Sequence, residues 1–452
     1  MPEPAGHHHR RFLANALMTW GTNIAVALFS LGNVLIVART LGPSGRGQVA
    51  FLTTIGTLVA YLVNMGVNQS NSNLGGTRPE LRPKLATNSL LFAGALGLGG
   101  GGVVLALIAA FPGVGGPTSG DVRLLALASV PALILSTYLS NLLQAQYEFV
   151  LTNLAWLISP LINVAGNTLM AATGTLTATR AVAIWVGGWV LSALMLVWGQ
   201  ARRAGFGRPD ARLARSMLGF GLKAHAGRVL MVGNYRLDQW LVGTLSSSRE
   251  LGLYSVAVAW AEALFYLPTA LTSVQRPDLV RASPREAARQ AAAVFRVATA
   301  ITVVLAIALV AAAPLLCGTI FGEQFRGSID DLRLLAAGGV GIVALKLLGQ
   351  TLTAQRKPML ETIAIAIAFG AGLALGLVLI PDHGGAGAAI AATIAYTAGG
   401  VAVMVIFVRA LAGRLRDLVP RAGDLAVLRR RLRPAPVATT EESGMDTTIV
   451  SP

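Results

Sequence analysis

Long apolar runs separated by short polar breaks fill the chain from Phe12 to Arg409. Each run reaches about 20 residues, the length that an α-helix needs to cross roughly 30 Å of hydrocarbon. Glycine, proline and polar residues mark the breaks, as in the segments 174–177 and 381–385. The pattern predicts an all-α polytopic membrane protein with twelve transmembrane helices, at approximately residues 12–38, 48–68, 86–111, 122–144, 150–172, 180–199, 217–244, 251–275, 293–316, 331–353, 358–380 and 386–409.

The composition agrees with this pattern. Of the 452 residues, 54% are hydrophobic and only 12% are charged, and the mean hydropathy is +0.64. Soluble domains carry about a quarter charged residues, so a soluble enzyme, a disordered scaffold and a collagen-like fibre are excluded. The first apolar run is too long for the core of a signal peptide and lacks a clear small-residue cleavage site, so we expect it to remain as a helix.

The distribution of basic residues predicts the orientation of the chain. Of the 36 Lys and Arg residues, 26 fall on the side that carries the N-terminus, seven fall on the opposite side and three lie within spans. Cytoplasmic loops are enriched in Lys and Arg, so both termini are expected in the cytoplasm. The net charge of +16 does not indicate a nucleic-acid partner, because no stretch interleaves basic and aromatic residues on a soluble module.

The longest interior break, residues 200–216, divides the spans into six plus six. The predicted organisation is a cytoplasmic N-terminus (1–11), an N-lobe (12–199), a basic cytoplasmic linker (200–216), a C-lobe (217–410) and a cytoplasmic tail (411–452). Six is even, so an internal repeat would be parallel, about an axis along the membrane normal. The segments Thr40–Gly47 and Thr244–Gly252 both read T-L-x-x-S followed by a short basic turn and a glycine. This similarity favours a true repeat, although chance could also produce it.

The tail is rich in Arg and Leu as far as Arg433 and then turns polar. Its first part could form a basic helix on the anionic inner leaflet. Each Lys or Arg near that surface contributes about 1 kcal/mol to the free energy of membrane binding. The acidic and polar end is expected to be disordered.

The informative residues are ionisable groups within spans, because a charge at mid-membrane costs at least about 2.5 kcal/mol and persists only in a cavity or a pair. Arg228 and Arg236 are about 12 Å apart along one helix and roughly 80° apart around it, so both can face one cavity. Asp238 is about 200° from Arg236, so we expect it to face a neighbouring helix or the outer water layer. Glu262 precedes Pro268, which should kink its span. Lys346 lies about two turns from the inner end of its span.

Structural alternatives exist for each of these residues. Arg236 with Asp238, or Arg228 with Glu262, could be interhelical pairs without a ligand; Glu262 could be a protonated carboxyl in a helix contact, and Lys346 could snorkel to the interface. The spans nevertheless hold three basic groups against two acidic ones. A cationic cavity in a membrane suits an anionic substrate, and arginine suits phosphate through its bidentate fork.

Several kinds of chemistry find no support in the sequence. There is no phosphate-binding G-x-x-x-x-G-K-[ST] loop and no H-E-x-x-H motif, and the single Cys317 excludes a disulfide framework or a CxxC site. No outer connection is long enough to hold a soluble catalytic domain. We therefore expect a transporter and not an enzyme, with no cofactor and no metal.

Segments spread along the chain resemble a known family. They are Ala38–Gly47, Leu142–Ala145, Arg236–Gln239, Glu250–Ala257, Pro268–Pro277, Phe321–Phe325 and Ile380–Ala389. In their order and spacing they are similar to the Wzx-type flippases of lipid-linked oligosaccharides, which belong to the multidrug/oligosaccharidyl-lipid/polysaccharide exporter superfamily. The likeness covers roughly residues 12–410.

The resemblance implies two six-helix lobes around a central cavity that alternates between inward- and outward-facing states. It implies a polyprenyl pyrophosphate carrying a short glycan as the substrate, moved from the inner to the outer leaflet of the bacterial cytoplasmic membrane for cell-surface polysaccharide synthesis. Membrane proteins of polysaccharide assembly would be partners. Substrate would meet Arg228 and Arg236, with Lys346 and Arg39 as further candidates. Coupling to H⁺ or Na⁺ could use Asp238 or Glu262. The first span has asparagines but no carboxylate, which puts the cation site of drug-exporting relatives in doubt.

Three rival functions remain. A drug/cation antiporter of the same superfamily would have an acidic cavity, whereas the spans here are net basic. A lipid II flippase would usually have fourteen spans. A membrane glycan polymerase would need carboxylates gathered at the outer face, where the candidates Glu323, Asp330 and Asp331 are expected to form a solvated loop.

Overall fold

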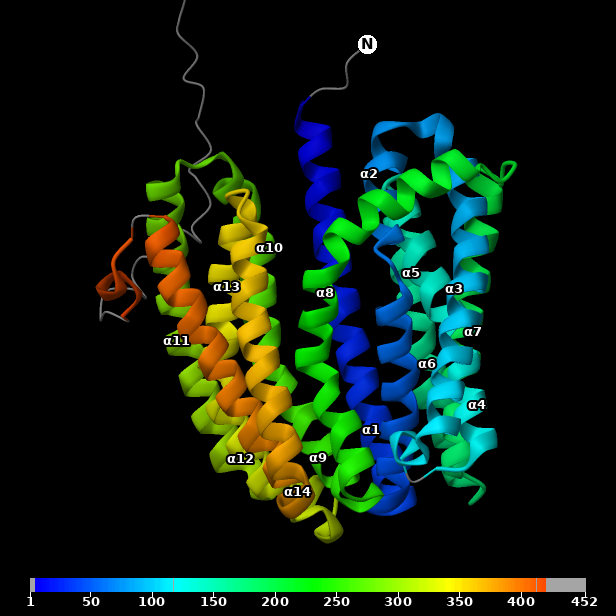
Figure 1. Cartoon of the computed structure of the whole chain (residues 1–452), viewed down its shortest axis with the longest axis vertical. Coiled ribbons are helices and arrows are strands. Elements are labelled where there is room, and N and C mark those ends of the chain that lie inside the picture. Colours follow the sequence, from blue (N-terminus) through cyan, green and yellow to red (C-terminus); the bar gives the residue numbers. More distant parts are fainter. Residues whose placement is uncertain (1–4, 117, 412, 420–452) are drawn as a thin grey trace, which may run out of the picture.

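The computed structural model describes residues 5–116, 118–411 and 413–419. Within these ranges the regular structure is helical, and Figure 1 shows two groups of helices with α8 between them. The longer elements are α1 (Ala5–Val63), α2 (Val67–Thr77), α3 (Arg82–Ala110), α4 (Gly120–Ala128), α5 (Val130–Gln144), α6 (Phe149–Ala172), α7 (Ala178–Arg203), α8 (Ala211–Leu245), α9 (Ser248–Ala261), α10 (Tyr266–Arg281), α11 (Pro284–Ala313), α12 (Ser328–Ala337), α13 (Gly339–Ala354) and α14 (Pro358–Ala410). The short elements are η1 (Pro79–Leu81), η2 (Pro112–Gly115), η3 (Glu262–Phe265), η4 (Pro314–Ile320), η5 (Glu323–Phe325) and η6 (Leu415–Leu418).

The described helices account for the twelve predicted spans. Eight are long and apolar enough to cross a membrane, and the bent pair α12–α13 makes nine. Two of these, α1 and α14, each contain two predicted spans, joined where Gly42 (φ 68°, ψ −177°) and Gly384 (φ 52°, ψ −126°) leave the helical conformation. The more polar α8 supplies the remaining span. Glycine suits both breaks because a positive φ is strained for other residues.

Caps and prolines in the sequence explain several helix ends. Asp210 accepts a hydrogen bond from Leu213 N (3.0 Å) at the start of α8, and Ser247 accepts one from Glu250 N (3.1 Å) at the start of α9. The predicted interruption before Pro268 is the 3₁₀ turn η3, because the proline ring excludes the carbonyl of Leu264 from the helical ladder. The ninth span is longer than predicted, since α11 continues as a π-helical turn to Ile320.

The two largest hydrophobic cores correspond to the two lobes, and each includes residues from a helix of the other lobe. The core of the C-lobe includes Ala38, Ala50 and Phe51 of α1, and the core of the N-lobe includes Met217 of α8. The first half of α8 therefore packs on the N-lobe, and its second half packs on the C-lobe against α14.

The linker lies against the N-lobe. Gly207 donates its N–H to Pro83 O (2.9 Å) and accepts from Thr87 Oγ1 (2.7 Å), while Asp210 pairs with Lys84 Nζ (3.1 Å). We call this end of the bundle, which holds residues 204–210 and both described ends of the chain, the linker end. The proposed tail helix and the polar tail lie outside the described residues beyond Val419.

Candidate functional site

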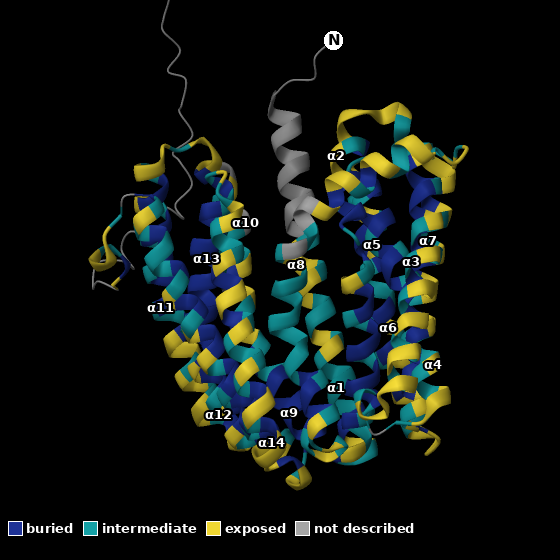
Figure 2. Ribbon diagram, in the orientation of Figure 1, coloured by how far each residue is buried: buried dark blue, intermediate teal, exposed yellow. Residues whose placement is uncertain are grey.

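At the end opposite the linker, the two lobes meet in a tight contact between α1 and α9. A Cβ atom added to Gly47 would overlap Ser248 O, and one added to Gly252 would overlap Pro43 O. Each glycine thus faces the carbonyl four residues before the other glycine, so the contact is symmetric. These segments are the two that the sequence marked as a repeat, and their symmetric packing supports the parallel repeat. We call this contact the seam, and Figure 2 shows buried ribbon gathered there around α9.

Arg39 also lies at the seam. Its Nε donates to Ile320 O (2.8 Å) and its Nη2 donates to Thr319 O (3.1 Å). Arg39 therefore joins the N-lobe to the C-terminal end of the π-helical turn η4. The side chain is exposed. A cation at the C-terminal end of a helix is favoured by the helix dipole. Arg39 therefore holds the lobes together at this end in the present state.

Arg236 forms an ion pair with Glu262. The distance from Arg236 Nη1 to Glu262 Oε1 is 2.9 Å, and the side chains are 34% and 29% exposed. Glu262 opens the 3₁₀ break between α9 and α10. Neither of the two pairs considered from the sequence, Arg236–Asp238 and Arg228–Glu262, forms. About one third of each side chain is exposed, so Arg236 is accessible to an incoming anion.

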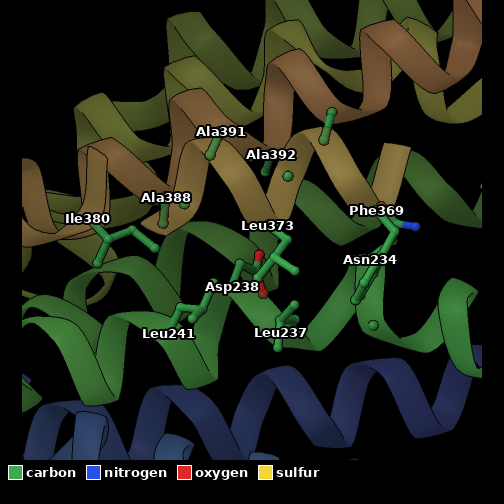
Figure 3. Close-up of a pocket in the computed structure, with 14 residues that line it drawn as sticks. Asn234, Leu237, Asp238, Leu241, Phe369, Leu373, Ile380, Ala388, Ala391 and Ala392 are labelled. Atoms are coloured by element: carbon green, nitrogen blue, oxygen red, sulfur yellow. The ribbon is translucent and has the colours of Figure 1, made fainter. Parts of the chain in front are cut away.

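Asp238 faces a neighbouring helix, as its position around α8 predicts. Tyr254 of α9 donates its hydroxyl to Asp238 Oδ2 (2.5 Å), and Gln239 N donates to Oδ1 (2.7 Å). Asp238 and Asn234 line a small cavity of about 30 Å³ between α8 and α14, and Figure 3 shows their side chains among apolar ones. This volume has room for about one water molecule.

Lys346 is held inside the C-lobe by aromatic rings. Its Nζ lies 5.6 Å from the ring centre of Tyr235 and 5.5 Å from that of Phe265, and it donates to Thr269 Oγ1 (2.8 Å). The rings attract the ammonium through their π faces. Phe265 follows Glu262 by three residues, so the 3₁₀ turn carries both the partner of Arg236 and a contact of Lys346.

Arg228 is exposed on α8, and among the described residues no acid lies within ion-pair distance of it. The adjacent Gly227 is close to Thr362 of α14. Of the three cations predicted within spans, only Arg236 is therefore paired with an acid in the part of the chain that the structure describes.

Two groups on the N-lobe were not singled out from the sequence. One is Arg46, whose buried Nε has no hydrogen-bond partner among residues 5–116, 118–411 and 413–419. The other is Tyr61, an exposed aromatic residue of α1. Arg46 stands in the basic turn of the repeat, which is the one sequence signal that could have pointed to it.

The prediction that Glu323, Asp330 and Asp331 form a solvated loop is wrong for Asp331. Glu323 and Asp330 are exposed and pair with Arg326 and Arg333 respectively. Asp331, however, is only 4% exposed, because α12 packs against α14 beside Gly385. The three carboxylates do not form an open acidic cluster.

Solved structures share this fold. The chain is similar to a lipid II flippase MurJ in its inward closed conformation, with 11% identity, a TM-score of 0.67 and coverage of 89% of each chain. It is also similar to an inward-facing MATE-family multidrug transporter (15% identity, TM-score 0.68, covering 90% of this chain and 96% of that one) and to an outward-facing one (16%, 0.60, 92% and 95%).

A search of curated proteins finds no match. A family model described as "Polysaccharide biosynthesis protein" matches residues 36–330, which is more than half of the chain and includes the seam, Arg236, Asp238 and Glu262. The chain therefore belongs to the polysaccharide biosynthesis protein family, and it has the fold of the multidrug/oligosaccharidyl-lipid/polysaccharide exporter superfamily.

Proposed function

We propose that this protein is a flippase that moves a polyprenyl-pyrophosphate-linked oligosaccharide from the inner to the outer leaflet of the bacterial cytoplasmic membrane. The observation that carries the proposal is that Arg228 and Lys346, both in membrane-spanning helices, have no acid within ion-pair distance in the described part of a chain that belongs to a polysaccharide biosynthesis family. Arg236 has one acidic partner, Glu262, whereas Lys346 is held by a hydroxyl and aromatic rings. A pyrophosphate would supply the missing negative charge.

The physical task is to carry a charged, hydrated head group through hydrocarbon while the lipid tail stays in the membrane. Cations on both lobes would replace the water around the phosphates, and Arg236 would exchange Glu262 for a phosphate oxygen. Rocking of the lobes would then expose the head group on the other side. Arg228 and Lys346 would contact the phosphates or the sugars, while Arg39, at the seam, would meet the substrate late in the cycle.

The described state corresponds to the inward-facing one. Most basic residues lie at the linker end, so this end and both termini would be cytoplasmic. The lobes are fastened at the opposite end by the seam and by Arg39.

Energy coupling would use a titratable group or a small cation. Asp238, beside its small cavity, and Glu262, paired with Arg236, are the candidates for H⁺ or Na⁺ coupling. Further proposed partners are anionic lipids of the inner leaflet, attracted by the basic tail, and membrane proteins of polysaccharide assembly. No enzymatic activity is proposed.

The rival transport functions predict different substrates at the same site. A drug/cation antiporter needs a net acidic binding site, whereas the described part of the chain holds two cations within spans, Arg228 and Lys346, without an ion-paired acid. A lipid II flippase would use the same pyrophosphate chemistry, and one solved structure with this fold is described as such a flippase. Lipid II therefore belongs in the assay as a comparison substrate.

The test is a flipping assay in proteoliposomes with a fluorescent polyprenyl-pyrophosphate glycan, in which a membrane-impermeant reagent reports the head group on the outside. Loss of one charged hydrogen bond to phosphate costs about 1.5–3 kcal/mol, so Arg236→Ala should slow transport about 10- to 150-fold. This change also leaves Glu262 without its partner, and Glu262 is itself a coupling candidate. The double variant Arg236→Ala with Glu262→Ala is therefore compared with Glu262→Ala alone and should be slower than it by a similar factor.

Arg180→Ala is the matched control, since Arg180 is an exposed arginine whose guanidinium donates to the backbone carbonyl of Thr175 in its own lobe. It should transport at the normal rate. Normal transport by both Arg236→Ala and Arg228→Ala, at normal expression, would remove these residues from the site. Export of organic cations without transport of the glycan lipid would instead favour the antiporter.

A further inference from the structure

A second cationic feature lies at the linker end of the C-lobe, apart from the Arg236 cluster. It is a groove of about 480 Å³ between α11 and the segment that follows α14. Its polar lining consists of Arg285, Arg289, Arg296, Arg414 and Asp417. Its floor is made of buried small and apolar side chains, namely Ala288, Ala292, Phe407 and Leu418. We call it the arginine groove.

Three of the arginines form a row along one face of α11. They are separated by four and by seven residues, which places them within about 40° of one another and spreads them over about 16 Å. Arg285 and Arg289 lie in the first two turns of the helix, where the dipole favours anions and not cations. The only acid in the first turn is Glu286, which pairs with Arg289. The row therefore has more positive than negative charge, although it lies at the end of the helix where the dipole favours negative charge.

The other wall of the groove is fixed in place. Arg296 Nη1 donates to Asp417 O (2.6 Å), which ties η6 to α11. Lys357 Nζ donates to Ala410 O (2.7 Å) and secures the end of α14. Arg414, exposed between these two attachments, faces the same groove as the row on α11. The groove is thus assembled from two separate parts of the chain.

The depth of the groove matches the lipid head-group layer. The apolar span that begins at Pro284 continues to Ile320 and has 37 residues, which is about 55 Å of helix. The hydrocarbon layer is only about 30 Å thick, so the first turns of α11 extend beyond it. Because the predicted ninth span starts at residue 293, Arg285 and Arg289 would lie among the phosphate groups and Arg296 at the edge of the hydrocarbon, with the apolar floor toward the acyl chains.

We propose that the arginine groove binds the phosphate of an anionic glycerophospholipid from the leaflet at the linker end. Arginine forks bind phosphate oxygens in a bidentate manner, and basic pockets between helices on the cytoplasmic side suit anionic head groups. The four arginines exceed the two carboxylates beside them, Glu286 and Asp417, by two positive charges, which an anionic head group neutralises and a zwitterionic one does not. A soluble anion would make no use of the apolar floor. This site is independent of the flippase reaction and uses none of its residues.

The experiment is native mass spectrometry of the full-length protein, titrated with phosphatidylglycerol or with phosphatidylcholine of the same acyl chains. The wild type should prefer phosphatidylglycerol. Each cation near the surface contributes about fivefold to binding, so Arg285→Gln with Arg289→Gln should weaken phosphatidylglycerol binding about 25-fold, and Arg414→Gln about fivefold. The matched control is Arg212→Gln with Arg215→Gln, which removes two exposed arginines from the first turns of α8 at the same end; it should bind normally.

Three results would overturn the proposal. The first is an equal loss in the α8 control, which would indicate general surface charge. The second is binding of free glycerol phosphate as strong as that of the lipid, which would indicate a soluble anion. The third is phosphatidylglycerol binding that emerges only after Glu441→Gln, Glu442→Gln and Asp446→Asn, which would assign the groove to the acidic end of the chain's own tail. A thermal unfolding curve without lipid shows that each variant is folded.

Discussion

Replacing Gly252 by alanine should open the seam. The added Cβ would overlap Pro43 O, a backbone atom at the start of the second half of α1 that cannot rotate away as a side chain can. The added Cβ would lie 1.9 Å from that oxygen, whereas ordinary contact begins at 3.4 Å, so the lobes would have to separate by more than an ångström. Forcing an extra methyl group into a packed contact costs about 1–3 kcal/mol, and that cost falls only on the state in which the seam is closed.

A cost of this size shifts the equilibrium between closed and open seam by about 5- to 150-fold toward the open state. Because the contact is symmetric, Gly47→Ala should have the same effect through Ser248 O. Transport should slow as well, since a flippase must return to the inward-facing state to load its substrate.

The assay is labelling of a cysteine placed in the seam with a membrane-impermeant maleimide. Ala50→Cys is a suitable probe because Ala50 is buried between the lobes, and the native Cys317 is itself buried and can be replaced by alanine. The labelling rate of the probe should rise by the same 5- to 150-fold in Gly252→Ala. Gly120→Ala is the control, because nothing lies within 4 Å of its added Cβ. If Gly252→Ala and Gly47→Ala both label as slowly as this control, the seam is not a gate.

Two further predictions concern hydrogen-bonded carboxylates. Tyr254→Phe removes the hydroxyl that donates to Asp238 and leaves a buried carboxylate oxygen unsatisfied, so the free energy of unfolding, measured by heat or denaturant, should fall by about 1–3 kcal/mol. Adding Asp238→Asn to the same chain should recover much of this loss. An unchanged free energy of unfolding in Tyr254→Phe would contradict the geometry. The Leu213 N–H and the ammonium of Lys84 hold the pKa of Asp210 below its ordinary value of 3.8, so its stabilisation is complete above this value and is lost as the pH falls through the lower pKa of the folded state. Asp210→Asn, which keeps the helix cap, should therefore flatten the acid side of the stability profile below about pH 4, and an unchanged acid slope in unfolding experiments would refute this.

The sequence alone determined the features that depend on local pattern. The spans follow from apolar length, because a helix must match the thickness of the hydrocarbon layer. The interruption before Pro268 follows from the missing N–H, and the orientation of Asp238 follows from the 100° step of the helix. The repeat was visible as two similar turns, although nothing local indicated that these turns touch.

Only the tertiary structure decided which charged groups meet. The sequence left open whether Glu262 couples an ion, pairs with Arg228 or is a protonated carboxyl in a helix contact; in the structure it pairs with Arg236 at the break η3. Lys346 lies between rings from two other elements, and Asp331 is buried because α12 packs against α14. Arg39 contacts carbonyls about 280 residues away. Such contacts depend on the rotation and height of one helix relative to another, and these are fixed by packing of the whole bundle and not by the hydrophobic period of any single helix.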